Sequence, residues 1–381
     1  MTNVPELRFD GFDGEWEEIQ LGIEADVRDG THDSPKYINK GYPLITSKNV
    51  VNGKLDFEDI SFISEEDFYL INKRSKVDIG DIIMPMIGTI GNPIILNRDD
   101  FAIKNVALIK KSNNLNNQFL LNLLKSKAFY RYLHRENAGG TQKFIALRVI
   151  REFLFNSPTI EEQEKIGDLF KKIDYLIENQ EGKVAKMEDF KKSMAQKMFP
   201  KKDELVPELR FDGFDGKWEE KVVGDLLDYE QPTKYIVSSE EYYETGIPVL
   251  TANKSFILGY TDEKNIYNKG EVVLFDDFTQ DMKYVNFPFM VKSSALKILT
   301  EKNSNLFFMF NLLSNINLIN EGHKRHYISV VQNTKVTVPS IEEQQKIGNF
   351  FKNLDSKIET EKKLLESYKM MKKSLLQKMF V

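Results

Sequence analysis

The chain has 381 residues, of which 41% are hydrophobic and 12% aromatic, and it contains no cysteine. Its length allows two sizeable cores, its composition is that of a folded protein, and the missing cysteines exclude disulfide scaffolds and thiolate metal sites. No apolar run reaches the roughly 20 residues of a membrane helix, and the first residues are polar and acidic, so we expect a cytoplasmic protein without a membrane span or signal peptide.

Two segments of the chain occur twice. Residues Val4–Trp16 return at Val206–Trp218 with one substitution. Pro158–Phe199 aligns without a gap to Pro339–Phe380, with 20 identities over 42 residues. The stretches between these repeats scarcely match. The sequence therefore predicts a duplicated frame that carries two different inserts.

Both inserts, residues 17–157 and 219–338, mix short β-rich runs with glycine and proline. Each is expected to be an α/β domain with a curved mixed β-sheet and helices. In chain order, the expected elements are strands at Leu44–Thr46, Ile79–Met86 and Pro93–Leu96 around a Gly88–Gly91 turn, a helix at Asn117–His134, strands at Val249–Thr251 and Val272–Leu274, and a helix at Asn305–Ile319.

The net charge of −5 is unevenly distributed. Residues 17–100 have 16 acidic and 9 basic side chains, whereas residues 101–157 have 2 acidic and 10 basic ones. The second insert repeats the trend more weakly, with −6 over residues 219–300 and +2 over residues 301–338. Because a nucleic-acid footprint is local, the basic rear of each insert allows DNA binding in spite of the total charge.

Each copy of the longer repeat is typical of one long helix. Thr159 and Ser340 are the expected N-caps, with Glu162 and Glu343 as the reciprocal arms of capping boxes. Apolar residues then follow at alternating steps of four and three, as in a coiled coil. The predicted seam consists of Ile166, Phe170, Ile173, Ile177, Val184, Met187, Ile347, Phe351, Leu354, Ile358, Leu365 and Tyr368. Because a lone helix cannot bury such a stripe, we expect the two helices to pair in antiparallel.

Joining the termini would regenerate the same order of elements, so the sequence predicts a pseudo-circular molecule with an approximate two-fold axis. The predicted domains are 1–157 with the repeat element 4–16, the first helix 158–199, a linker 200–205, 206–338 with the repeat element 206–218, and the second helix 339–381.

This order of insert, long helix, insert and long helix resembles the specificity subunit of type I restriction–modification systems. The motifs that carry the resemblance are Asp29-Gly30-Thr31-His32 with Ser34-Pro35, the GYPLITSKN segment from Gly41 to Asn49, Gly80-Asp81-Ile82-Ile83, Gly88-Thr89-Ile90-Gly91, and the PTIEEQ helix start at Pro158. One departure is visible, since the second insert has Phe275-Asp276-Asp277-Phe278 in place of the Gly-Thr-Ile-Gly loop.

The resemblance implies a non-catalytic reader of double-stranded DNA. Each insert would be a target recognition domain for one half of a bipartite, asymmetric sequence. The helices would be the spacer and the docking surface for two methyltransferase subunits, with a restriction subunit in systems that cleave. S-adenosylmethionine, ATP and Mg²⁺ would belong to those partners, so this chain is expected to hold no cofactor and no metal.

Base edges are read by side chains that form two-pronged hydrogen bonds, whereas phosphates require only donors and positive charge. The candidate DNA-binding residues are Thr31, His32, Ser47, Lys48, Asn49, Thr89, Gln142 and Lys143 in the first insert, and Thr251, Asn253, Lys254, Lys324, Arg325 and His326 in the second. Arg131, Arg135, Arg148 and Arg151 are expected to contact phosphates or to form surface ion pairs. We assign the repeated Trp16 and Trp218 to packing.

An enzymatic interpretation finds little support in the sequence. The chain has neither an Asn-Pro-Pro-Tyr nor an Asp-Pro-Pro-Tyr motif of adenine methyltransferases, and it has no P-loop. His323 and His326 have metal-ligand spacing, but no acidic cluster lies near them in sequence. The remaining alternative is a coiled-coil scaffold whose two heads bind proteins instead of DNA.

Overall fold

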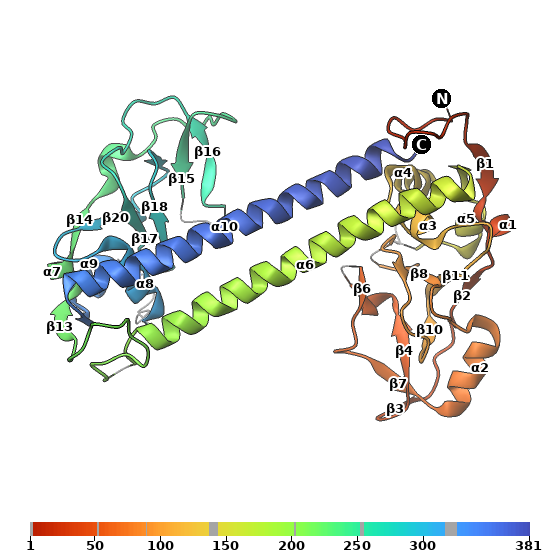
Figure 1. The fold of residues 1–381 in the computed structure, drawn as a ribbon, viewed down its shortest axis with the longest axis horizontal. Helices are drawn as coiled ribbons and strands as arrows, with labels where there is room; N and C mark the ends of the chain where they lie inside the picture. The colour runs from red at the N-terminus through yellow and green to blue at the C-terminus, as the bar shows by residue number, and fades with distance from the viewer. Residues whose placement is uncertain are drawn as a thin grey trace. The chain divides into compact units, whose positions relative to one another are not determined.

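The structure is a computed structural model that describes residues 3–51, 53–88, 90–136, 144–201, 203–251, 255–316 and 326–381, with the side chain of His326 excepted. It contains two compact units. Unit 1 comprises Met1–Glu181 and Leu364–Val381, and unit 2 comprises Gly182–Lys363. Figure 1 shows the two long helices, α6 (Ile160–Met198) and α10 (Ile341–Lys378), and each of them contributes one part to either unit.

The first head, residues 17–157, lies entirely in unit 1. Its helices are α1 (Leu21–Glu24), α2 (Glu65–Ser75), α3 (Asn117–Leu123), α4 (Lys127–Glu136) and α5 (Leu147–Arg151), with a 3-10 turn at Ser47–Asn49. Its strands are β1 (Glu17–Gln20), β2 (Val27–Asp29), β3 (Tyr37–Ile38), β4 (Tyr42–Thr46), β5 (Val50–Val51), β6 (Lys54–Leu55), β7 (Ser61–Ile63), β8 (Ile82–Pro85), β9 (Ile94–Ile95), β10 (Ala102–Lys104), β11 (Val106–Ile109) and β12 (Leu154–Ser157).

Two four-stranded sheets form the first head. One is antiparallel, in the order β2-β11-β8-β9. The other has the order β10-β4-β7-β3 and pairs β10 with β4 in parallel. The central strands β8 and β11 are buried along their whole length, as expected for apolar runs with both faces covered. The mixed α/β class is confirmed, although the strands divide between two sheets where the sequence predicted one.

The second head, residues 219–338, lies in unit 2. Its helices are α7 (Val223–Leu226), α8 (Leu306–Asn315) and α9 (His326–Ser329), with 3-10 turns at Pro232–Tyr235 and Val331–Asn333. Its strands are β13 (Glu219–Val222), β14 (Leu227–Glu230), β15 (Ile247–Leu250), β16 (Ile257–Thr261), β17 (Val272–Asp276), β18 (Met282–Val285), β19 (Met290–Val291), β20 (Leu296–Glu301) and β21 (Lys335–Val338).

The second head repeats the plan of the first. Its antiparallel sheet has the order β14-β20-β17-β18, so that β17 and β18 take the places of β8 and β9. Its smaller sheet, β16-β15-β19, pairs β15 with β19 in parallel, as β4 pairs with β10. The two heads therefore share a fold although their sequences scarcely match.

The two long helices pair in antiparallel within each unit. In unit 1 Asp174 of α6 binds Lys372 of α10, and in unit 2 the repeat-related Asp355 of α10 binds Lys191 of α6 at 2.5 Å. Of the predicted seam residues, Ile166, Phe170, Ile173, Val184, Ile347, Phe351, Leu354, Ile358 and Leu365 are buried, and Ile177, Met187 and Tyr368 are half-buried.

The short repeat element attaches each head to the helix ends. In unit 1 Arg8 donates from Nε and Nη2 to the two carboxylate oxygens of Glu162, each at 2.8 Å, and Glu162 is fully buried. Arg210 binds Glu343 in the same way in unit 2, at 2.7 Å. The capping-box prediction assigned both glutamate side chains to the backbone of their own N-caps. It gave the wrong partner because local spacing could not reveal an arginine from outside the helix.

The element also joins distant parts of the chain. In unit 1 the N–H of Leu7 donates to the carbonyl of Lys378 at 2.9 Å, so the N-terminal segment lies beside the end of α10 (Figure 1). In unit 2 Leu209 donates in the same way to Lys197, at 2.8 Å. These paired contacts agree with the pseudo-circular arrangement that the repeats predict.

Trp16 and Trp218 pack in matching cores. Their rings lie 6.1 Å from Phe119 and 5.9 Å from Phe308, and both tryptophans are buried, as predicted. The predicted helix 117–134 is divided by a turn after Leu123, and the predicted helix 305–319 ends at Asn315. Within the described part of the chain, every helix is too short or too polar to span a bilayer.

Candidate nucleic-acid interface

Three predicted DNA-binding residues of the first head meet at Asn105, which the sequence did not single out. Asn105 connects β10 to β11 with a positive φ of 58°. Its N–H donates to the carbonyl of Thr31 at 3.2 Å, and its carbonyl accepts the Ser47 hydroxyl at 2.9 Å. Its Oδ1 lies 3.0 Å from Nδ1 of His32. Asn105 therefore joins the loop after β2 to the turn after β4.

The imidazole of His32 is held at both nitrogens. Its Nε2 lies 2.9 Å from the carboxylate of Asp29, whose other oxygen accepts a hydrogen bond from Arg74. The hydrogen bonds to Asp29 and Asn105 raise the pKa of His32 because both favour the imidazolium form. The His32 side chain remains 52% exposed. His32 therefore offers positive charge and a ring face to a ligand, while its N–H groups are engaged inside the protein.

Gly30 allows this loop to lie close to β10. A Cβ atom at Gly30 would stand 2.5 Å from the carbonyl oxygen of Ile103, which accepts the N–H of Thr31. Any side chain at this position would force the loop outward. The glycine of the Asp29–His32 motif is therefore explained by backbone packing that positions Thr31 and His32.

The next two predicted residues differ in what they can contact. Lys48 forms an ion pair with Asp59 at 3.1 Å, and because both side chains are exposed the lysine can exchange this partner for a phosphate. Asn49 is buried. Its Oδ1 accepts from the N–H and hydroxyl of Thr46, and its Nδ2 donates to the carbonyls of Asp56 and Asp59. Asn49 shapes the turn, so the structure does not fit its predicted role at a base edge.

Several of the predicted residues lie outside the described residues. They are Thr89, Gln142, Lys143, Asn253, Lys254, Lys324 and Arg325, and the side chain of His326, where α9 begins, is also undescribed. Their roles stay predictions.

The four arginines that were expected to contact phosphates or form ion pairs have different settings. Arg151 donates twice to the carbonyl of Val27, at 2.9 and 2.6 Å, and therefore braces β2. Arg148 binds Glu152 on the surface. Arg131 and Arg135 lie exposed on α4, where a phosphate can reach them.

The second head presents different groups at the matching place. The N–H of Val237 donates to the carbonyl of Val291 at 3.0 Å, as Thr31 does to Ile103 in the first head. Ser238 therefore stands where the first head has His32, and its N–H binds the carboxylate of Glu263. The predicted Thr251 is buried at the end of β15, with 8% of its surface exposed. It therefore has little surface to offer a base.

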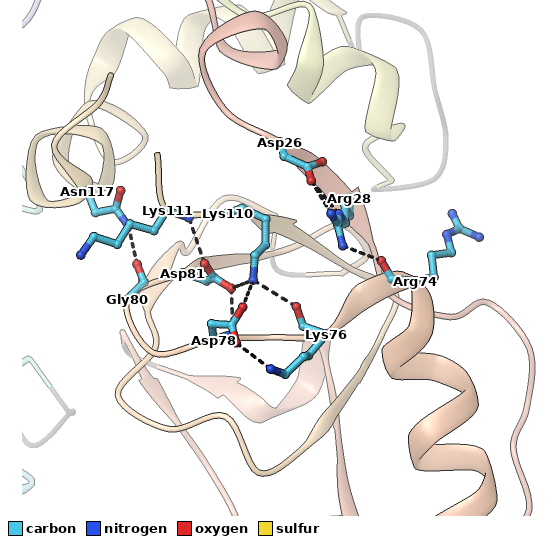
Figure 2. Close-up of polar contacts among 10 residues, drawn as sticks. All are labelled: Asp26, Arg28, Arg74, Lys76, Asp78, Gly80, Asp81, Lys110, Lys111 and Asn117. Atoms are coloured by element: carbon cyan, nitrogen blue, oxygen red, sulfur yellow. Dashed lines mark hydrogen bonds and ion pairs between the residues drawn. The ribbon is translucent and has the colours of Figure 1, made fainter. Parts of the chain in front are cut away.

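The Gly80-Asp81 motif anchors the start of β8. Figure 2 shows the buried carboxylate of Asp81 between the ammonium of Lys110 and the backbone N–H of Lys111. Lys110 also binds Asp78 at 2.6 Å and the carbonyl of Lys76 at 3.2 Å. Because β8 and β11 are antiparallel, the residues just before β8 lie beside those just after β11, and the network joins the two central strands at this end of the sheet. The motif is structural in this head.

A second buried ion pair, in the other head, was not predicted from the sequence. Lys297 and Asp277 are each 1% exposed, and their charged groups lie 3.1 Å apart. Asp277 also accepts the N–H of Tyr327 at 2.9 Å. The pair therefore ties the end of β17 to α9, the element that follows the predicted basic run. Lysine at an apolar strand position would have been the only available hint.

Comparison with known protein families matches residues 14–189 and 215–369 to the type I restriction modification DNA specificity domain. Together the two matches cover most of the chain. The chain belongs to this family.

Two curated members of the specificity family resemble parts of this chain. The EcoR124I/EcoR124II specificity subunit of Escherichia coli is 40% identical over 149 residues, which are 36% of each chain. The MjaVIII specificity subunit of Methanocaldococcus jannaschii is 29% identical over 191 residues, 47% of this chain and 44% of that one. The matches thus span less than half the length of these relatives.

The fold of this family member is also found among solved structures. The S subunit of the type I restriction–modification system from M. genitalium superposes with a TM-score of 0.70 at 18% identity, over 99% of both chains. A chain from a structure of type I restriction–modification complex assembly gives 0.52 at 14% identity, over 95% of this chain and 96% of that one. The whole specificity chain, including both heads and both helices, thus has a known fold.

Proposed function

We propose that this chain is the DNA sequence-specificity subunit of a type I restriction–modification complex. The observation that supports this best is one repeated frame with two heads of the same fold and different surfaces. Two half-sites of unlike sequence require two such readers, so the target is asymmetric and bipartite. Membership of the specificity family supports the same conclusion and disfavours the protein-binding scaffold.

The helix pair supports a role as spacer. Half-site spacing is a geometric quantity, and dimeric or two-headed readers match it to their own dimensions. Helices that pair along a buried seam bend less than a polar linker does. The exposed side chains of α6 and α10 would receive two methyltransferase subunits, to which this proposal assigns S-adenosylmethionine and the methylation of a flipped adenine. ATP and Mg²⁺ would belong to a restriction subunit.

Exchange of one head tests the proposal. Residues 17–157 are replaced by the first insert of another family member, and methylated sites are mapped in a host that carries the cognate methyltransferase gene. We expect one half-site to change and the other to stay, because each head reads alone. A change in both half-sites would contradict independent heads. Specific binding of the full chain should also fall steeply with salt, whereas a protein scaffold would bind DNA without sequence selectivity.

DNA affinity should depend on pH through His32. Its raised pKa means that the imidazolium is present below that pKa and is lost as pH rises through it. The loop then loses the positive charge of His32, while the charges of the neighbouring Asp29 and Arg74 stay the same. We expect wild-type affinity to fall from about pH 6 to about pH 8.5 at constant salt, and His32→Gln to flatten this profile. Fluorescence anisotropy with the mapped target measures the affinity of wild type and variant at each pH. If the two affinities depended on pH in the same way, His32 would not be part of the interface.

A further inference from the structure

The same hairpin of each head ends in an exposed apolar side chain. The β8–β9 and β17–β18 hairpins occupy matching places in their sheets. Ile87 lies two residues beyond the end of β8 and is 42% exposed. Phe278 lies two residues beyond the end of β17 and is 54% exposed. Two sequences that scarcely match thus each place a large apolar side chain near the tip of this hairpin, Ile87 five residues after the start of β8 and Phe278 six residues after the start of β17.

Hydrogen bonds fix the backbone at each of these tips. In the first head Gly88 has a φ of 77°, and its carbonyl accepts the N–H of Ile90 at 3.0 Å. In the second head one oxygen of Asp276 accepts the N–H of Phe278 at 2.8 Å, and the other accepts the hydroxyl of Thr279 at 2.7 Å. These turn hydrogen bonds hold the backbone that carries each tip side chain in one conformation.

The tip of the first head lies beside elements that carry cationic residues. Ile87 forms a β-bridge with Phe144, which is also 42% exposed and directly follows the predicted Lys143 in sequence. The turn lies against α4, since a Cβ on Gly91 would be 3.7 Å from Leu133. Helix α4 carries the exposed Arg131 and Arg135.

The tip of the second head has a comparable setting. Asp277, next to Phe278, accepts the N–H of Tyr327. Tyr327 follows the predicted residues Lys324, Arg325 and His326 in the sequence. The carboxylate of Asp277 is itself neutralised by the buried Lys297. In both heads the apolar tip therefore lies beside the point where the predicted DNA-binding run returns to the fold.

We propose that these tip side chains, Ile87 in the first head and Phe278 in the second, contact bases of their half-sites through apolar surface. This inference rests on the proposed function. Cations beside the tip would hold phosphates, and the apolar group between them would face the bases. Apolar side chains contact bases either at the thymine methyl group or by insertion into a base step. Both modes use the same surface, and the experiment separates them.

Phe278→Ser tests the inference, with Phe287→Ser as a matched control. Phe287 is 38% exposed and lies two residues beyond the end of β18 that is away from the tip. Each full chain, bound to its methyltransferase subunit, is titrated with the mapped target and with a duplex whose second half-site is scrambled. We expect Phe278→Ser to weaken target binding about tenfold and to leave the scrambled duplex unaffected, as for loss of one base contact. Phe287→Ser should change neither.

Two DNA substitutions then distinguish the modes. If Phe278 contacts a methyl group, replacing one thymine by deoxyuridine lowers the affinity of the wild type as much as Phe278→Ser does. On that DNA the variant and the wild type then bind with equal affinity. If Phe278 enters a base step, the fluorescence of 2-aminopurine placed at that step increases when wild-type protein binds and stays quenched when the variant binds. Either result supports the inference.

The inference and the proposed function fail in different ways. If wild type does not discriminate target from scrambled duplex, the proposed function fails. If wild type discriminates and Phe278→Ser discriminates equally well, only the inference is overturned. Phe278→Leu, which keeps apolar surface, should retain most of the affinity, so equal losses in the serine and leucine variants would also overturn it. Ile87→Ser repeats the test in the first half-site.

Discussion

Arg8→Met is expected to lower the free energy of unfolding of unit 1 by about 3–5 kcal/mol, because it leaves the carboxylate of Glu162 buried without its partner. Glu162 is fully buried, and both of its oxygens accept hydrogen bonds from Arg8. Urea denaturation followed by circular dichroism measures the change. Arg210→Met should affect unit 2 to the same degree, since Glu343 is equally enclosed.

Two further variants separate this effect from loss of charge. Arg148→Met removes an exposed ion pair with Glu152 and should lower the free energy of unfolding far less than Arg8→Met does. The double variant Arg8→Met with Glu162→Met removes both buried charges and should recover much of the loss. An Arg8→Met variant no less stable than Arg148→Met would show that the buried pair contributes little.

Lys125→Met is expected to stabilise unit 1 at neutral pH. Lys125 is half-buried beside Lys372 and Asp174, and desolvation, followed by the charge of Lys372, lowers its pKa to about 8. The folded state therefore binds a proton less readily than the unfolded state, whose lysine has an ordinary pKa. Stability of the wild type consequently rises with pH between the two values. Methionine should add about 1–3 kcal/mol at pH 7, and this gain should vanish near pH 10.5.

The second head supplies the comparison for this prediction. Asn116 and Asn305 are matching helix caps, since their N–H groups bind the matching residues Gln163 and Gln344. Counted from these caps, the second head has Ser314 where the first head has Lys125. Lys127→Met, at an exposed position of the same head, is the control and should change stability little at any pH. Thermal denaturation of both variants across the pH range decides, and a pH-independent difference for Lys125→Met would refute the assignment.

The elements that rest on local or repeated patterns could be predicted. The seam at Ile166 and Phe170, the strands beginning near Leu44 and Ile82, and the packing of Trp16 each follow from periodicity or duplication. These predictions hold because the residues of each pattern lie on one face of their element and are buried together there.

The contacts between distant residues could not be predicted. Glu162 has the spacing of a capping-box arm, but its partner Arg8 comes from 154 residues earlier. Asn105 organises the Thr31 and Ser47 loops from a turn that no motif marks. Of the candidate site, the loop regions around Thr31 and Ser47 were found from sequence, whereas the groups that hold them were not.

The hydrogen bond from Leu7 to Lys378 has a consequence for synthesis on the ribosome. Unit 2 is continuous in sequence, whereas unit 1 needs Leu364–Val381, including the buried Phe380, to complete its core. Unit 1, which contains the first residues to be synthesised, can therefore complete its core only after the last residues have been synthesised. Unit 2 can fold before that point. A nascent chain would expose the apolar stripe at the start of α6 until translation has passed beyond Lys378.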